Sequence, residues 1–162
     1  MIRYIVISTL VFMALICHAK PTDLEKINSM FDDYQKEFKS VPIIDPNDKL
    51  IELSSYIIVD VREPKERNVS FIKNSISKSE FSHQKDNYKN KKVLVYCTIG
   101  YRSGSFASDL KKDGFDAYNL KGGVLLWIQS GRGLINKIGE TKSVHVYGQK
   151  WNLVPPGWHA IW

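Results

Sequence analysis

Cysteine is scarce in this chain, which has only Cys17 and Cys97 among its 162 residues. So few cysteines exclude a fold held together by a disulfide framework. Long blocks of like charge are also absent, although the formal net charge is +6. We interpret this excess as a solvated basic surface and expect no nucleic-acid partner. Because His145 and His159 are isolated in the sequence, we predict no metal site, and no motif predicts a cofactor.

The first residues carry the pattern of a secretory signal peptide. A short basic start precedes the apolar run Tyr4–Ile16, and small residues follow up to Ala19. We therefore predict a signal peptide over residues 1–19 and a periplasmic or secreted protein. The run is too short for a stable membrane anchor, and the bulky Ile16 before Cys17 disfavours a lipoprotein. Cleavage leaves Cys97 as the only cysteine, so we expect no internal disulfide.

The rest of the chain alternates between apolar runs typical of buried strands and polar or amphipathic runs typical of helices. Strands are expected at 41–44, 56–61, 71–77, 93–96 and 115–120, and helices at 49–53, 80–88, 103–112 and 124–129. This alternation predicts an α/β fold with a central, mostly parallel sheet flanked by helices. In such sheets, functional sites form beyond the carboxyl ends of the strands.

Two flanking segments are expected on either side of a domain that spans residues 41–132. Residues 20–40 are predicted to form an added N-terminal helix, because Thr22 and Glu25 make a capping box and an apolar stripe follows. We expect this stripe to dock on the domain, with a partner-binding helix as the alternative. Residues 133–162 are expected to form a C-terminal extension packed on the domain, with a strand at 143–147. We interpret its aromatic residues as packing residues rather than as a ligand platform.

Cys97 stands where a predicted buried strand gives way to a loop and then to a helix. The N-terminus of a helix presents unpaired N–H groups and a partial positive charge, which favour a thiolate over a thiol. Arg102 adds a fixed cation, and the amides of the loop can surround an anionic group on the sulfur. This position disfavours the alternative that Cys97 is an inert buried thiol.

The size of the loop separates two kinds of chemistry. A nucleophilic thiolate can take up a sulfane sulfur as a persulfide or a phosphoryl group as a thiophosphate. Both products are anionic, so hydrogen bonds from loop amides and the charge of an arginine stabilise either of them. Only four residues lie between Cys97 and Arg102, which makes a pocket small for a tetrahedral phosphate. The loop therefore favours sulfur chemistry.

Three segments of the chain resemble the motifs of the rhodanese (sulfurtransferase) domain family. They are Asp60-Val61-Arg62-Glu63-Pro64, then Cys97-x-x-Gly100-x-Arg102-Ser103, then Leu120-Lys121-Gly122-Gly123 with Trp127. They follow one another in the family's order between about Ile43 and Gly131. Sulfurtransferases of the family have this loop length, whereas related cell-cycle phosphatases have one residue more. Where relatives usually have Gly-His-Ile-Pro-Gly-Ala after the first motif, this chain has Ser70-Phe71-Ile72-Lys73-Asn74-Ser75, which keeps only the isoleucine.

The resemblance implies a sulfurtransferase that carries a sulfane sulfur as a persulfide on Cys97. The expected donor is a small thiosulfate-like or persulfide compound. Cys97 and Arg102 are the predicted catalytic residues. The predicted substrate-binding residues supply loop amides, hydroxyls or charge, and they are Thr98, Ile99, Gly100, Tyr101, Ser103, Asp60 and Arg62. For Asp60 and Arg62 we expect either structural support as an ion pair or direct contact with substrate. The Ser103 hydroxyl either binds the sulfur or caps the helix.

Other functions stay open at this level. The first is a non-catalytic rhodanese-like module that binds a partner protein. Less favoured is a cysteine-based phosphatase or arsenate reductase. A third variant is an exported sulfur-relay protein in which Cys97 receives sulfur from another protein. Because no second cysteine remains to resolve Cys97, the acceptor is expected outside the chain, as cyanide, glutathione or a partner's thiol.

Overall fold

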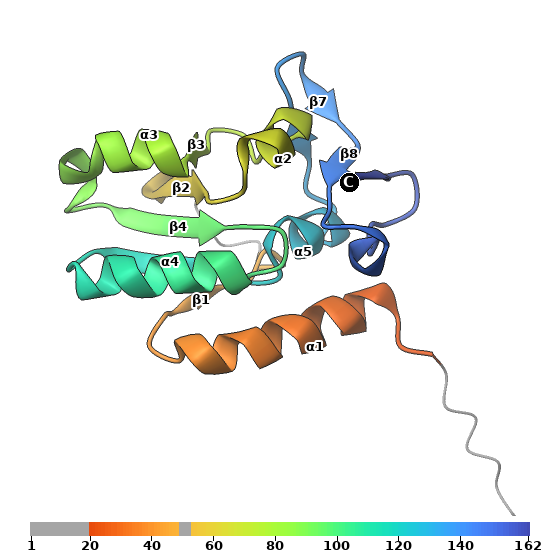
Figure 1. Cartoon of the computed structure of the whole chain (residues 1–162), viewed down its shortest axis with the longest axis horizontal. Helices are drawn as coiled ribbons and strands as arrows, with labels where there is room; N and C mark the ends of the chain where they lie inside the picture. Colours follow the sequence, from red (N-terminus) through yellow and green to blue (C-terminus); the bar gives the residue numbers. More distant parts are fainter. Residues whose placement is uncertain (1–19, 49–52) are drawn as a thin grey trace, which may run out of the picture.

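A computed structural model of the chain describes residues 20–48 and 53–162 (Figure 1). The predicted signal peptide at 1–19 lies outside these residues, as does most of the helix predicted at 49–53. Within the two described stretches, no helix combines the length and the apolar composition that crossing a bilayer requires.

Parallel strands form a five-stranded central sheet in the order β1-β5-β4-β2-β3. The strands are β1 (Ile43–Ile44), β2 (Tyr56–Asp60), β3 (Ile76–Ser77), β4 (Lys92–Tyr96) and β5 (Asp116–Leu120). Each falls inside or beside a run predicted as a strand. The α/β prediction is therefore confirmed. The two edge strands are shorter than predicted, and β4 lies between β5 and β2, where parallel strands are most deeply buried.

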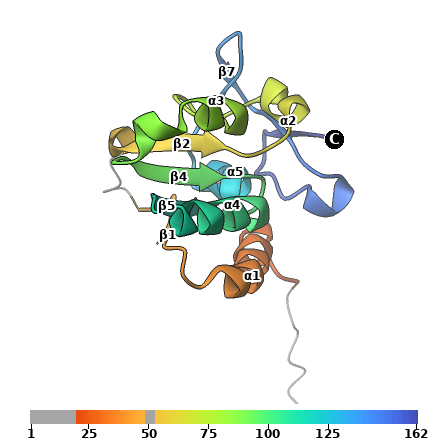
Figure 2. The same ribbon diagram turned by 60° about the vertical axis from the view of Figure 1, so that its left-hand side comes forward.

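Helices cover both faces of the sheet (Figures 1 and 2). The helices α3 (Lys78–His83) and α4 (Tyr101–Lys112) pack on one face, and α5 (Gly123–Gln129) packs on the other. Successive side chains of a strand point to opposite faces. Val93 and Val95 of β4 therefore join the core under α3 and α4, whereas Leu94 and Tyr96 join the core under α5.

The N-terminal segment forms helix α1 (Asp23–Gln35), followed by a 3₁₀ turn at Lys36–Phe38. Its capping box forms as predicted, with the Thr22 side chain accepting a hydrogen bond from the backbone of Glu25. Ile27 and Phe31 of the apolar stripe are fully buried, and the helix packs against α4 and α5. This contact places α1 beside the segment that follows β4 (Figure 1).

The C-terminal segment adds four short strands to the molecule. They are β6 (Leu134–Ile135) and β7 (Glu140–Thr141), which pair antiparallel, and β8 (Ser143–His145) and β9 (His159–Ile161), which pair parallel. Only β8 lies in a predicted strand, the one at 143–147, because no comparable run of alternating apolar and polar side chains marks the other three. Val144, Val146 and Leu153 are buried in the core under α5, so the segment packs on the domain.

A short helix, α2 (Pro64–Val69), follows β2 and is absent from the prediction. The strand predicted at 56–61 stops before Pro64, and no helix is predicted to follow it. In the structure, Pro64 occupies the first turn of α2, where its missing N–H costs nothing. Glu63 and Glu66 form a capping box that closes this turn. The helix contacts β8, so α2 joins the sheet to the C-terminal segment.

Candidate active site

The Cys97 sulfur lies at the N-terminal end of α4, directly after β4. Its Sγ accepts a hydrogen bond from the backbone N–H of Gly100 at 3.1 Å and from the Ser103 hydroxyl at 3.5 Å. Gly100 is the N-cap residue of α4, and Ser103 lies in its first turn. Both donors and the positive end of the helix dipole therefore stabilise negative charge on the sulfur.

Helix α5 holds the carbonyl groups at the start of the loop. The Val124 N–H donates to the Cys97 carbonyl at 2.9 Å, and the Leu125 N–H donates to the Thr98 carbonyl at 3.2 Å. This close approach requires Gly123, because a Cβ there would lie 2.3 Å from the Cys97 carbonyl oxygen. The Gly122-Gly123 pair of the third motif thus brings the α5 N-terminus against the cysteine loop.

Gly100 gives the loop its turn into α4. Its φ of 118° lies in the region that favours glycine. Its carbonyl accepts hydrogen bonds from Gly104 N–H at 2.9 Å and from Asn119 Nδ2 at 3.0 Å. A Cβ at Gly100 would lie 2.4 Å from the Phe31 ring of α1. The added N-terminal helix therefore packs directly on the cysteine loop.

A pocket of about 360 Å³ opens above Cys97. The residues that line it are Tyr34, Cys97, Thr98, Ile99, Tyr101, Arg102, Tyr147 and Trp151. Tyr34 comes from α1, and Tyr147 and Trp151 come from the C-terminal extension, so both flanking segments contribute to the pocket wall. Trp158 packs against the core, as expected for the extension. Trp151 also packs there, but it lines the pocket as well, which corrects the interpretation of the aromatic residues as packing residues only.

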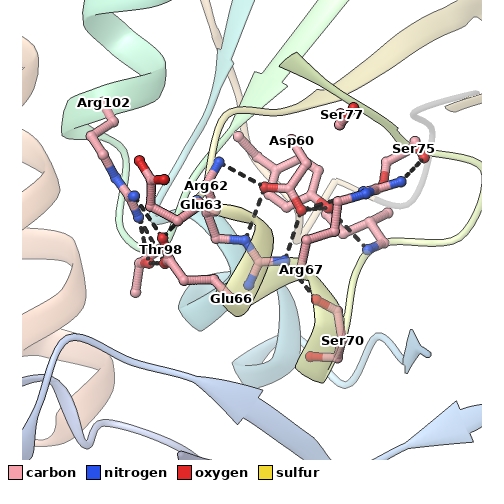
Figure 3. A network of polar contacts seen from close by, with 12 residues as sticks. Asp60, Arg62, Glu63, Glu66, Arg67, Ser70, Ser75, Ser77, Thr98 and Arg102 are labelled. Carbon is pink, nitrogen blue, oxygen red and sulfur yellow. Dashed lines mark hydrogen bonds and ion pairs between the residues drawn. The ribbon is translucent and has the colours of Figure 1, made fainter. Parts of the chain in front are cut away.

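Arg102 is held by Glu66 of α2 in a two-pronged ion pair (Figure 3), with nitrogen–oxygen distances of 2.7 and 2.9 Å. The guanidinium also donates to Thr98 Oγ1 at 3.1 Å and lies over the Tyr147 ring at 4.7 Å. Arg102 is predicted as the electrostatic partner of the cysteine loop or of a donor anion. In the structure its principal partner is Glu66, which is not among the predicted site residues.

The ion pair fixes the charge of both side chains. Burial alone would raise the pKa of Glu66, but the hydrogen bonds from Arg102 and from the Glu63 backbone lower it below its ordinary value. Burial alone would lower the pKa of Arg102, but the bonds to Glu66 and the charge of Cys97 raise it. Both side chains are therefore ionised at neutral pH, and their charges cancel beside the pocket.

Asp60 and Arg62 form a second ion pair, behind the loop (Figure 3). Arg62 donates to the two Asp60 carboxylate oxygens at 2.9 and 2.8 Å and to the Ser70 carbonyl at 2.7 Å. Tyr96 donates its hydroxyl to Asp60 at 2.7 Å. Both charged side chains are 0% exposed and neither lines the pocket. Of the two expected roles, substrate contact is therefore corrected to structural support.

The altered stretch after the first motif still forms its turn. Asn74 occupies the place of the second glycine of the relatives' pattern and has a φ of 64°. Asparagine is one of the few residues with a side chain that tolerate this left-handed conformation. The turn delivers Ser75, whose hydroxyl contacts Tyr96 Oη at 3.1 Å and accepts from Arg67 at 2.8 Å. The changed sequence therefore preserves the support of the Asp60 pair.

The other predicted residues divide between the sulfur and the pocket wall. Ser103 is not the helix cap, since Gly100 holds that position, and its hydroxyl contacts the sulfur. Thr98 and Ile99 are buried in the loop. Tyr101 is 43% exposed and packs edge-to-face on Tyr34, with ring centres 5.3 Å apart. Cys97 forms no disulfide within the described part of the chain.

Residues missed at the site come from outside the cysteine loop. They are Glu66, Tyr34, Tyr147 and Trp151. A signal for Glu66 was present, because a proline followed two residues later by a glutamate is typical of a helix start. No local signal marks the three aromatic residues, whose place at the pocket depends on how both flanking segments fold back on the domain.

The fold and the site together define a class of protein, a parallel α/β domain with a cysteine-containing loop between β4 and α4. A family model described as "Rhodanese-like domain" matches residues 44–130, more than half of the 162-residue chain. The chain therefore belongs to the rhodanese-like domain family. Solved structures agree with this assignment. A rhodanese-related protein from Thermoplasma volcanium is 30% identical, with a TM-score of 0.52, over 58% of this chain and 97% of that protein.

Two further relatives differ in size from this chain. A thiosulfate sulfurtransferase from Pseudomonas aeruginosa shares the fold at 18% identity with a TM-score of 0.53, over 82% of this chain and 26% of that one. Among curated proteins, the tRNA uridine(34) hydroxylase of Aster yellows witches'-broom phytoplasma (strain AYWB) is 35% identical over 80 residues, 43% of this chain and 26% of that protein. The chain spans about a quarter of the length of this curated relative.

Proposed function

We propose that the protein is a sulfurtransferase that carries sulfur on Cys97. The observation that carries this proposal is the environment of the Cys97 sulfur. The sulfur accepts hydrogen bonds from Gly100 N–H and the Ser103 hydroxyl, and Cys97 lines an open pocket. A persulfide on Cys97 is anionic, and we expect its terminal sulfur to lie in the pocket that Cys97 lines, beside the N-terminus of α4. Helix N-termini bind anions because these amides have no partner within the helix.

The reaction has two balanced steps. The Cys97 thiolate attacks the outer sulfur of a donor, so a new S–S bond forms and the donor's bond to that sulfur breaks. The electron pair of the broken bond leaves with the rest of the donor. In the second step an external thiolate or cyanide attacks the terminal sulfur, and the electron pair returns to Cys97 as thiolate. We expect the acceptor outside the chain, because removal of residues 1–19 leaves Cys97 as the only cysteine.

Mass spectrometry of the intact protein tests the proposal. After exposure to thiosulfate or to glutathione persulfide, we expect one added sulfur atom at Cys97. Cyanide should remove this sulfur as thiocyanate, and Cys97→Ser should take up none. Failure of every sulfane donor to modify Cys97 would support the non-catalytic binding module instead. Release of phosphate from an aryl phosphate, or reduction of arsenate, would support the phosphatase or reductase.

We also propose that the protein is exported after removal of residues 1–19. The proposal rests on the basic start, the apolar run and the small residues before Ala19. N-terminal sequencing of the protein from whole cells should give a chain that begins at Lys20. A chain that keeps Met1, or that stays in the cytoplasmic fraction, would contradict export and leave the sulfurtransferase proposal unaffected.

A further inference from the structure

The pocket above Cys97 is larger than a small inorganic donor requires. Its volume of about 360 Å³ equals that of about a dozen water molecules, at ~30 Å³ each. A dianion with the size of thiosulfate fills only a small part of it. The remaining space has to be occupied by water or by the rest of a larger donor.

Aromatic rings form much of the pocket wall. They belong to Tyr34, Tyr101, Tyr147 and Trp151, which come from α1, the start of α4 and the C-terminal extension. The Tyr34 and Tyr101 rings pack edge-to-face with centres 5.3 Å apart, so each limits the movement of the other. Rigid aromatic walls gain most from an apolar or aromatic ligand group, which packs on them with little loss of conformational entropy.

The pocket carries little net positive charge with which to bind a small dianion. Arg102 is the only cationic residue among those that line it in the described part of the chain. Its guanidinium is bound by the buried Glu66 carboxylate at 2.7 and 2.9 Å, and Tyr147 lies against the guanidinium at 4.7 Å. A second anion beside this pair meets the negative charge of Glu66 as well as the positive charge of Arg102. It also loses hydration on entering an aromatic pocket.

We infer that this site selects a sulfane-sulfur donor that bears an aromatic or similarly bulky apolar group and at most one negative charge, in preference to a small dianion. The inference rests on the proposed function and names its donor class. In the transfer step, the Cys97 thiolate attacks the terminal sulfur of the donor, and the S–S bond to the organic group breaks. The organic part leaves with the electron pair, while the rings of the pocket hold it in line with Sγ.

Three donors separate charge from shape. Thiosulfate is a small dianion, methanethiosulfonate is a small monoanion, and benzenethiosulfonate is a monoanion with an aromatic ring. Each transfers its terminal sulfur and leaves a sulfite or a sulfinate. The second-order rate constant of persulfide formation on Cys97 is measured for each by quenched-flow mass spectrometry. Each constant is divided by the rate with free glutathione, which removes differences in intrinsic reactivity.

We expect the normalised rate constant of benzenethiosulfonate to exceed that of methanethiosulfonate by about tenfold, the gain from one good aromatic packing contact. Trp151→Ala should reduce this ratio to near one. Trp162→Ala is the matched control, because Trp162 belongs to the same extension, is 63% exposed and does not line the pocket. It should leave the ratio unchanged. Since Trp151 also packs on the core, Tyr34→Ala tests the wall formed by α1 independently.

The outcomes distinguish the inference from the proposed function. If none of the three donors adds sulfur to Cys97, the sulfurtransferase proposal fails. If sulfur is added but the ratio is one or less in the natural protein, the donor class is wrong and the sulfurtransferase stands. The donor class is also wrong if folded Trp151→Ala and Tyr34→Ala variants, checked by circular dichroism, both keep the full preference.

Discussion

At the scale of single residues, the reactivity of Cys97 depends on neighbours with different roles. Gly100 supplies a backbone donor and a conformation that few other residues adopt. Ser103 supplies a side-chain donor from the first turn of α4. Only the Ser103 hydroxyl can be removed by a substitution that leaves the backbone unchanged. Ser103 therefore offers a clean test of how hydrogen bonding to the sulfur contributes to its chemistry.

Ser103→Ala should slow both persulfide formation and alkylation of Cys97 by iodoacetamide at pH 7. We expect a decrease of about tenfold, since a hydrogen bond to a charged group contributes roughly 1.5 kcal/mol. Ser105→Ala is the matched control, because Ser105 lies in the same helix but is exposed. Rates are compared by mass spectrometry at equal donor concentration. Equal rates for the two variants would show that the Ser103 hydroxyl does not stabilise the anionic sulfur.

At the scale of secondary-structure elements, the cysteine loop is fixed by the start of α5 as much as by its own helix α4. The first amides of α5 bind the carbonyls of Cys97 and Thr98. This contact joins two segments that are more than twenty residues apart in the chain. The two glycines of the third motif have φ values of 61° and 53°, so they turn the chain sharply into α5.

Gly123→Ala should therefore disturb both stability and the site. Its Cβ would meet the Cys97 carbonyl oxygen at 2.3 Å, and its φ of 53° is unfavourable for alanine. Together, overpacking and backbone strain should lower the free energy of unfolding by about 3 kcal/mol. Gly133→Ala is the control, since a Cβ there meets nothing within 4 Å. Urea unfolding gives the stabilities. A Gly123→Ala protein as stable as the control would contradict this role of the α5 contact.

The elements that could be predicted from the sequence are those with a local signal. The apolar run of β4 and the glycine-containing loop after it placed Cys97 correctly at a strand end before α4. The fold class followed from the alternation of strands and helices. Helix α2 was missed because six residues show no reliable periodicity, although Pro64 and Glu66 carried a helix-start signal. Because α2 was not predicted, Glu66 was not recognised as the partner of Arg102.

The rest of the site could not be predicted because it depends on contacts distant in sequence. Glu66 and Arg102 are separated by 36 positions, and no local pattern links them. Trp151 and Tyr34 meet at one pocket only after α1 and the C-terminal extension fold over the loop. An aromatic residue in a tail has the same local sequence whether it packs on a core or lines a pocket.

At the scale of the whole molecule, the flanking segments and the domain form one structure around the cysteine. Helix α1 packs against α4 and α5, and the extension packs against α2 and the core under α5. Two buried carboxylates, Asp60 and Glu66, tie the sheet, α2 and α4 together through Arg62 and Arg102 (Figure 3). The stability of the molecule should therefore depend on these carboxylates being ionised.

This dependence predicts how the protein unfolds in acid. Hydrogen bonds and ion pairs outweigh burial and lower the pKa of both Asp60 and Glu66 in the folded state. Their unfolded values lie near 4. Their contribution to stability is therefore complete above about pH 4 and is lost as the pH falls through the lower folded values. Urea midpoints measured from pH 7 to pH 2.5 should fall steeply below about pH 4.

Glu66→Gln isolates one of these carboxylates. In this variant Arg102 loses its partner but is 27% exposed and can be hydrated, so we expect the free energy of unfolding at pH 7 to fall by about 2 kcal/mol. For comparison, Asp60→Asn would leave the fully buried Arg62 charge unpaired and lower the free energy of unfolding by about 3–5 kcal/mol. Because the Glu66→Gln variant has no titrating group at position 66, its free energy of unfolding should fall less steeply in acid than that of the natural protein. The exposed carboxylates are common to both proteins and cancel in the comparison. Equal acid dependence of the two proteins would show that the Glu66–Arg102 pair does not couple the fold to pH.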